Sequence, residues 1–118
     1  MGTFRVDVTV SNLVDRRRSL TLPLLVDTGA TYTTLPREVA DALGLEPIET
    51  RRVRLGDGRE DRWPITAIFV RMDGREGPSF AWIGPPGGPA ILGAVTLEEF
   101  ALTVDPSAKR LIPTVSLA

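Results

Sequence analysis

The feature that most constrains this chain is a single aspartate at the point where an apolar segment gives way to a turn. Leu24-Leu25-Val26 is typical of the end of a strand, and it leads directly into Asp27-Thr28-Gly29-Ala30. The small residues of the turn allow close backbone approach on either side of the carboxylate. The pattern therefore predicts a carboxylate held at a strand end, which is a suitable position for a catalytic acid.

Composition narrows the chemistry that is available to such a site. The 118 residues contain no Cys and no His, which excludes disulfides, thiolate or imidazole metal sites, cysteine nucleophiles and Ser/His/Asp catalysis. With 42% hydrophobic residues, 25% charged residues and a formal net charge of −1, the chain reads as soluble and globular. It has no electrostatic reason to bind nucleic acid or an anionic membrane. Carboxylates remain the natural catalytic groups.

The length predicts one domain over residues 1–118, which can bury roughly two-thirds of its unfolded surface. Met1 to Asn12 lacks the charged and apolar regions of a signal peptide, and no apolar stretch approaches the length of a membrane span. We therefore expect a cytoplasmic location and no membrane partner.

The pattern of apolar residues predicts a mainly β protein. Phe4, Val6, Val8 and Val10 alternate with polar residues, as in a strand with one buried face. A polar connection over 12–19 and a return strand over 20–26 would complete a hairpin. Short helices are expected over 34–44, ended by Gly44, and over 95–100. Further strands are expected over 51–55, 63–72, 79–83, 101–104 and 111–117.

Three elements in the correct order resemble the retropepsin-like aspartic proteases, over nearly the whole chain. They are Asp27-Thr28-Gly29-Ala30, a turn-rich candidate flap at Leu55-Gly56-Asp57-Gly58-Arg59, and the later apolar pair and glycine of Ile91-Leu92-Gly93-Ala94. The resemblance implies a closed, barrel-like β-sheet with one or two short helices, assembled as a two-fold homodimer. It also implies that the late glycine element packs under the active-site loop.

The resemblance further implies an aspartic endopeptidase. Hydrolysis by carboxylates requires two of them, one ionised and one protonated, because like charges a few ångströms apart do not both ionise cheaply. This chain has one Asp-Thr-Gly, so each subunit would supply Asp27. Thr28 would bridge the two loops and Gly29 would leave room for the substrate. The nucleophile is water, no metal or cofactor is required, and activity is expected in acid, at roughly pH 4 to 6.

The same family pattern assigns substrate contacts to the active-site turn, to the flap and to the segment before the late glycine. These residues are Ala30, Thr31, Gly56, Asp57, Gly58, Ile83, Gly84 and Pro85. The loop over 84–89 has three prolines and three glycines, so it either lines the cleft or is only a linker. Trp63 and Trp82 fit either the core or the cleft.

Two departures distinguish the chain from viral retropepsins and indicate the cellular and bacterial branch. Thr31 and Ala94 stand where viral enzymes have an acidic residue and an arginine, so the active-site loop must be supported in another way. The flap is also more polar. An alternative function therefore stays open, a peptide-binding or assembly module of the same fold that does not cut. A third alternative is an unrelated small β-barrel in which Asp27 only caps a turn.

The homodimer would need a seam between subunits. The strand over 4–10 and the apolar tail over 111–117 are the candidates, because retropepsin dimers interleave their terminal strands. The tail fits equally the last strand of a monomer's own sheet.

Overall fold

The N-terminal hairpin forms as the alternating pattern predicts. In the computed structural model, which describes residues 3–118, β1 (Arg5–Asn12) pairs antiparallel with β2 (Ser19–Val26). Val8 and Val10 are completely buried, whereas Asp7 is exposed and Thr9 is only partly buried. The hairpin therefore presents one face to the core, and β2 ends at the residue before Asp27.

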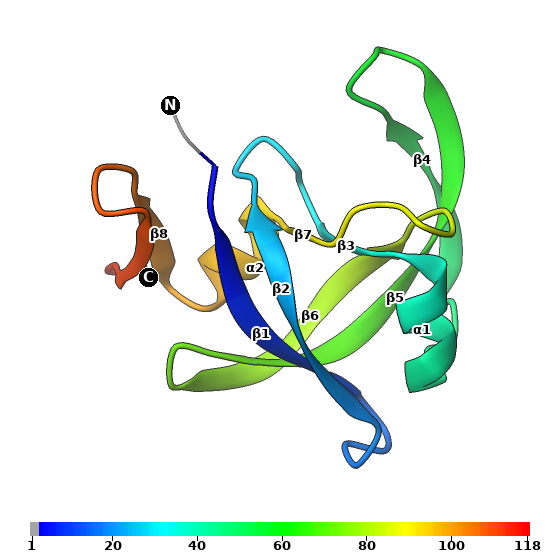
Figure 1. The fold of residues 1–118 in the computed structure, drawn as a ribbon, viewed down its shortest axis with the longest axis horizontal. Helices are drawn as coiled ribbons and strands as arrows, with labels where there is room; N and C mark the ends of the chain where they lie inside the picture. Colours follow the sequence, from blue (N-terminus) through cyan, green and yellow to red (C-terminus); the bar gives the residue numbers. More distant parts are fainter. Residues whose placement is uncertain (1–2) are drawn as a thin grey trace.

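Seven strands form the main sheet in the order β1-β2-β7-β3-β6-β5-β4 (Figure 1). β1 also pairs with β5, so the hydrogen-bonded neighbours from β1 round to β5 make a closed circuit, with β4 outside it. The remaining strands have these bounds: β3 Thr33–Leu35, β4 Glu49–Arg54, β5 Glu60–Met72, β6 Arg75–Ile83 and β7 Ile91–Leu92. The fold is mainly β, as predicted.

A separate two-stranded sheet follows the second helix. It consists of β8 (Leu102–Asp105) and β9 (Arg110–Pro113), paired antiparallel. The predicted strand over 111–117 is therefore too long, because strand structure ends at Pro113. Beyond it, Thr114 donates one backbone hydrogen bond to Ala101, and residues 114–118 are exposed. Among residues 3–118, no strand pairs with residues 114–118.

Two short helices accompany the sheet. α1 (Arg37–Leu43) begins after Pro36 and ends at Gly44, whose φ of 66° is the left-handed conformation that glycine adopts readily. The prediction that this helix starts at Thr34 was wrong: Thr34 and Leu35 belong to β3. The residue before a proline avoids helical geometry, and β3 pairs with β6. α2 (Ala94–Glu99) forms within one residue of its predicted range.

The core lies within the circuit of strands. It is formed by buried aliphatic residues of β1, β2, β5 and β7, with contributions from both helices and β8: Val8, Val10, Leu24, Leu43, Ile68, Leu92, Leu97 and Leu102 are among its members. Among residues 3–118, no helix is both long enough and apolar enough to cross a bilayer.

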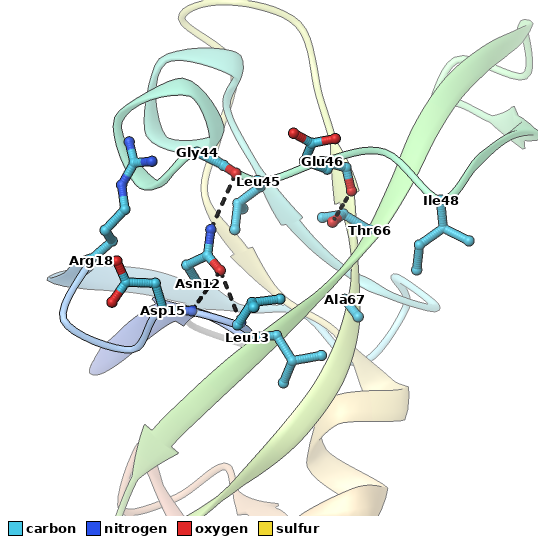
Figure 2. Close-up of a pocket in the computed structure, with 11 residues that line it drawn as sticks. Asn12, Leu13, Asp15, Arg18, Gly44, Leu45, Glu46, Ile48, Thr66 and Ala67 are labelled. Atoms are coloured by element: carbon cyan, nitrogen blue, oxygen red, sulfur yellow. Dashed lines mark hydrogen bonds between the residues drawn. The ribbon is translucent and has the colours of Figure 1, made fainter.

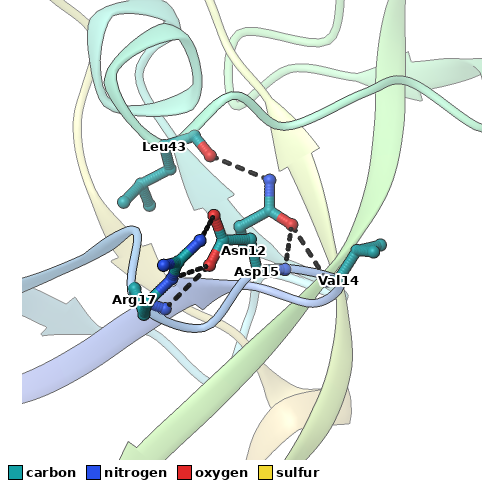
Figure 3. Close-up of polar contacts among 5 residues, drawn as sticks. All are labelled: Asn12, Val14, Asp15, Arg17 and Leu43. Atoms are coloured by element: carbon teal, nitrogen blue, oxygen red, sulfur yellow. Dashed lines mark hydrogen bonds and ion pairs between the residues drawn. The ribbon is translucent and has the colours of Figure 1, made fainter.

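Asn12 joins the tip of the first hairpin to the end of α1 (Figure 3). Its amide nitrogen donates to the carbonyls of Leu43 and Gly44 at 2.9 and 3.1 Å. Its amide oxygen accepts from the backbone N–H groups of Val14 and Asp15. All the hydrogen-bonding capacity of this side chain is used, so the hairpin loop and the helix end are held as one unit.

A hollow with a volume of about 530 Å³ lies beside this joint (Figure 2). Its apolar lining comes from the hairpin loop, from the segment after α1 and from β5, and includes Leu13, Leu45, Ile48 and Ala67. Asp27 does not line it.

Candidate active site

Asp27 lies at the carboxyl end of β2, in a turn that its own side chain stabilises. One carboxylate oxygen accepts a hydrogen bond from the backbone N–H of Gly29 at 2.9 Å, and the N–H of Ala30 donates to the Asp27 carbonyl at 3.2 Å. A Cβ atom added at Gly29 would lie 3.1 Å from the same carboxylate oxygen, so glycine leaves that oxygen its space. Asp27, Thr28 and Gly29 are all exposed. The turn thus presents a carboxylate to solvent from a fixed strand end.

The late glycine element lies against this turn, in the place that the sequence predicts. The N–H of Asp27 donates to the carbonyl of Leu92 at 3.1 Å. The N–H groups of Ala94 and Val95 donate to the carbonyls of Ala30 and Thr31 at 2.8 and 2.9 Å. The first residues of α2 therefore hold the far side of the loop while β7 holds its beginning.

Gly93 is required at this contact for steric reasons. A Cβ atom there would lie 2.4 Å from the carbonyl carbon of Tyr32 and 2.7 Å from the nitrogen of Thr33. Both are backbone atoms, so no side chain can move aside to make room. The close approach explains why the apolar pair Ile91-Leu92 is followed by glycine.

A buried chain of hydroxyl groups supports the loop from below. The N–H of Gly93 donates to Oγ1 of Thr33, which lies 2.7 Å from Oγ1 of Thr96. Thr96 lies 2.8 Å from Oγ of Ser79, which donates to a carboxylate oxygen of Glu99 at 2.6 Å. Each hydroxyl has one hydrogen to donate. With Glu99 ionised, Ser79 donates to Glu99, so Thr96 donates to Ser79 and Thr33 donates to Thr96. These hydrogen bonds support the active-site loop in this chain, in which Thr31 and Ala94 cannot form an ion pair with each other.

A groove with a volume of about 690 Å³ opens beside Asp27. Its walls come from the active-site turn, from β4 and the start of the flap, and from aromatic residues of β5 and β6. The lining residues are Asp27, Gly29, Ala30, Thr31, Tyr32, Thr34, Arg51, Arg52, Val53, Arg54, Leu55, Gly56, Trp63, Trp82 and Ile91. Of the predicted substrate contacts, Ala30, Thr31 and Gly56 are in this lining.

The other predicted contacts lie elsewhere. Asp57 and Gly58 form the exposed tip of the β4–β5 hairpin, where Gly58 has a φ of 89°. Ile83 and Gly84 are buried, and Pro85 is exposed; none of them lines the groove.

The loop over 84–89 is fastened to the start of α1. The carboxylate of Glu38 accepts a hydrogen bond from the N–H of Gly87 at 3.0 Å, and this bond lowers the pKa of Glu38. The N–H of Gly84 donates to the carbonyl of Leu35. In this chain the loop is a connection held by α1 and β3 and forms no wall of the groove.

The sequence left Trp63 and Trp82 open between the core and the cleft, and both line the groove together with Tyr32, as an aromatic wall. The ring of Tyr32 lies 5.5 Å from that of Trp82, edge to face, and Trp82 lies 6.3 Å from Trp63 in the same manner. The symmetry of the flap hairpin was an available signal for the position of Trp63. Arg51 and Trp63 are each six residues from Asp57, and they are direct cross-strand partners. Folding the sequence at its Gly-Asp-Gly turn would have placed them side by side.

The β4–β5 hairpin that carries the flap projects on the same side of the molecule as the turn after β2 (Figure 1). At its tip the backbone N–H of Arg59 donates to the carboxylate of Asp57, and the side chains of the same two residues form an ion pair of 2.6 Å. The backbone hydrogen bond is the larger cause of the lowered pKa of Asp57. The tip is an exposed polar turn closed by these two contacts. Among residues 3–118, no three carboxylates gather in a group that could hold a metal ion.

Comparison with known proteins identifies the family of this arrangement. The family model described as aspartyl protease matches residues 6–96, which include the Asp27 turn, the flap and the late glycine element. The chain belongs to the aspartyl protease family. A search of curated protein sequences finds no significant match.

Solved structures show that the chain has a retropepsin-like fold. A retropepsin-like aspartic protease from Rickettsia conorii is 23% identical, with a TM-score of 0.63 over 89% of this chain and 78% of that one. The retroviral protease-like domain of Ddi1 from Leishmania major is 16% identical, with a TM-score of 0.60 over 93% and 88%. EIAV protease in complex with the inhibitor HBY-793 is 19% identical, with a TM-score of 0.58 over 83% and 88%.

Proposed function

We propose that this chain is an aspartic endopeptidase, folded as a single domain over residues 1–118, that hydrolyses peptide bonds as a homodimer with one Asp27 from each subunit. The observation that carries the proposal is the position of Asp27. It is exposed at a strand end, its turn is fixed from two sides, and it lines a groove bounded by the flap hairpin. Family membership supports the same chemistry.

The proposed reaction uses the two carboxylates in complementary states. The ionised Asp27 takes a proton from water, whose oxygen attacks the peptide carbonyl carbon. The protonated Asp27 donates to the carbonyl oxygen, and the tetrahedral intermediate then breaks at the C–N bond as the amine receives a proton. Two carboxylates that share one proton titrate as a unit, so activity is expected in acid.

Thr28 and the chain termini are suited to the proposed seam. Thr28 is exposed and, with Phe4 and Val104, lines a second hollow of about 350 Å³, which Asp27 lines as well as the groove. Val115 and Leu117, two residues apart in the tail, are 88% and 99% exposed. We propose that the tail and the N-terminal segment pair with their counterparts in the second subunit, which would bury these side chains and bring the two Asp27 turns together.

The test is proteolysis of an unfolded protein mixture at pH 3 to 7, with wild type beside Asp27→Asn. The expected result is cleavage by wild type alone, strongest in acid, with a specific activity that rises with enzyme concentration because only the dimer is active. Folding of the variant is checked by its thermal transition. Cleavage that persists in folded Asp27→Asn would contradict the shared dyad. A specific activity constant down to nanomolar enzyme would contradict an obligate dimer of modest affinity.

A second candidate function is supported by the edge of the sheet. β4 pairs only with β5 among the described strands, so its other edge is open for an added strand. A peptide could pair there and lie along the groove without being cut. Peptide binding by a folded, dimeric wild type that cleaves nothing across the pH range would favour this function.

A further inference from the structure

One side chain in the groove is both positively charged and fixed in place. Along β4, Arg51 and Val53 are partly buried, whereas Arg52 and Arg54 are exposed. This alternation puts Arg51 on the inner face of the flap hairpin with Val53, and its cross-strand partner Trp63 shares that face. Arg51 is thus the arginine of β4 that faces the groove with the apolar residues.

Aromatic groups hold the Arg51 guanidinium. One terminal nitrogen donates to the hydroxyl of Tyr32 at 3.3 Å, and the guanidinium carbon lies 5.8 Å from the centroid of the Phe80 ring. Nε donates to Glu49. A guanidinium has five N–H donors, so three remain without an acceptor among residues 3–118.

The charges that line the groove are unbalanced. Arg51, Arg52 and Arg54 line it, and Asp27 is the one acidic residue in the lining. Arg52 and Arg54 are both paired with Glu60, and Arg51 is paired with Glu49, but neither glutamate lines the groove. A ligand in the groove therefore meets a carboxylate at the Asp27 end and guanidinium donors at the β4 end.

We propose that the groove selects extended peptides that carry an acidic side chain at one position, removed from the scissile bond and bound by Arg51. A carboxylate there receives charge-assisted hydrogen bonds from the free donors of Arg51. The neighbouring wall of Tyr32, Trp63 and Trp82 accommodates an apolar or aromatic side chain next to the acidic one. This inference rests on the part of the proposed function that places a peptide in the groove.

The two tryptophans provide the readout, because they are the only ones in the chain and both line the groove. Tryptophan-free octapeptides, with Glu or Gln placed at each position in turn, are titrated into Asp27→Asn while the intrinsic fluorescence is recorded. Anisotropy of labelled peptides measures the same binding independently. We expect one position at which Glu binds about tenfold more tightly than Gln.

Matched variants assign the preference to the side chain. Arg51→Gln removes the difference between the Glu and Gln peptides, and Arg51→Lys keeps only part of it because the planar fork is lost. Arg71→Gln is the control, since Arg71 is an exposed arginine paired with Glu76 outside the groove, and it keeps the full preference. Thermal transitions of the variants show that each is folded.

Three results would overturn the inference: equal binding of Glu and Gln peptides at every position, a preference that survives in folded Arg51→Gln, or no binding of any peptide by either method. Cleavage by wild type is measured separately. If the wild type cuts peptides without an acidic preference, the proposed function stands and this inference fails. If the protein prefers acidic peptides but cuts none, this inference stands and the proposed endopeptidase activity fails.

Discussion

The strongest prediction concerns the buried hydroxyl of Thr96. Replacing Thr96 by Val keeps the shape of the side chain and removes its hydrogen bonds to Thr33 and Ser79. A net loss of about 1 kcal/mol for each bond gives about 2 kcal/mol of unfolding free energy. For 118 residues, an unfolding entropy of about 2.1 cal/mol/K per residue converts this into a fall in Tm of about 8 °C.

Calorimetry at one fixed protein concentration measures this shift, because a dimer would make Tm depend on concentration. Thr103→Val is the matched control. Thr103 lies exposed on β8, and its replacement is expected to change stability by less than about 0.5 kcal/mol. Thr96→Ser retains the hydroxyl and loses one methyl group, at a cost of about 1 kcal/mol.

The reasoning also predicts an effect on catalysis. Thr33 contacts both Thr96 and the N–H of Gly93, so loss of the chain loosens the support of the active-site loop. In a catalytic dimer, kcat should fall in Thr96→Val more than in Thr96→Ser, with KM little changed. If Thr96→Val were no less stable than Thr103→Val, the hydroxyl chain would not be the support that we describe.

Three further predictions address other contacts. Asn12→Ala should lower the urea midpoint by an amount equivalent to about 2 kcal/mol, since two hydrogen bonds to the end of α1 and two within the hairpin loop are lost; an unchanged midpoint would contradict the joint. Gly93→Ala should cost about 3 kcal/mol or more, because the added Cβ meets the Tyr32 backbone, and a wild-type melting curve would refute it. The hydrogen bond from the Gly87 N–H lowers the pKa of Glu38 in the folded protein. This bond therefore stabilises the fold fully at pH values above the ordinary pKa of Glu, and its contribution disappears as the pH falls through the lower pKa of the folded state. The Gly87 amide shift, followed by NMR, should titrate with a midpoint below 4.5, and Glu38→Gln should abolish that titration.

Local pattern was sufficient for the elements with strong periodicity. Alternation along β1 and the glycine after α1 located these elements within a few residues. β3 and β7 are three and two residues long, too short for any period to be seen. They exist because the neighbouring strands supply hydrogen-bonding partners, and this information lies in distant parts of the chain.

The site was only partly predictable for the same reason. The Asp27 turn depends on adjacent residues and could be seen directly in the sequence. The contact of Thr33 with Thr96 joins residues 63 positions apart, and the aromatic wall depends on strand register. The loop over 84–89 has a composition that fits a cleft wall and a linker equally. A hydrogen bond to Glu38, across 49 positions, fastens it to α1.

The two-residue strand β7 determines how the active-site turn can move. It pairs in parallel with β2, which precedes the loop over 27–32, and antiparallel with β3, which follows it. Both ends of the loop are therefore held by the same short strand. Movement of the outer hairpins leaves the distance between these two ends unchanged. Hydrogen exchange should reflect this: the amide of Asp27, bonded to Leu92, should exchange only when β7 itself detaches, whereas the exposed amide of Thr28 should exchange freely. The backbone that carries the Asp27 carboxylate is thus held by Leu92, which is a buried residue of the core.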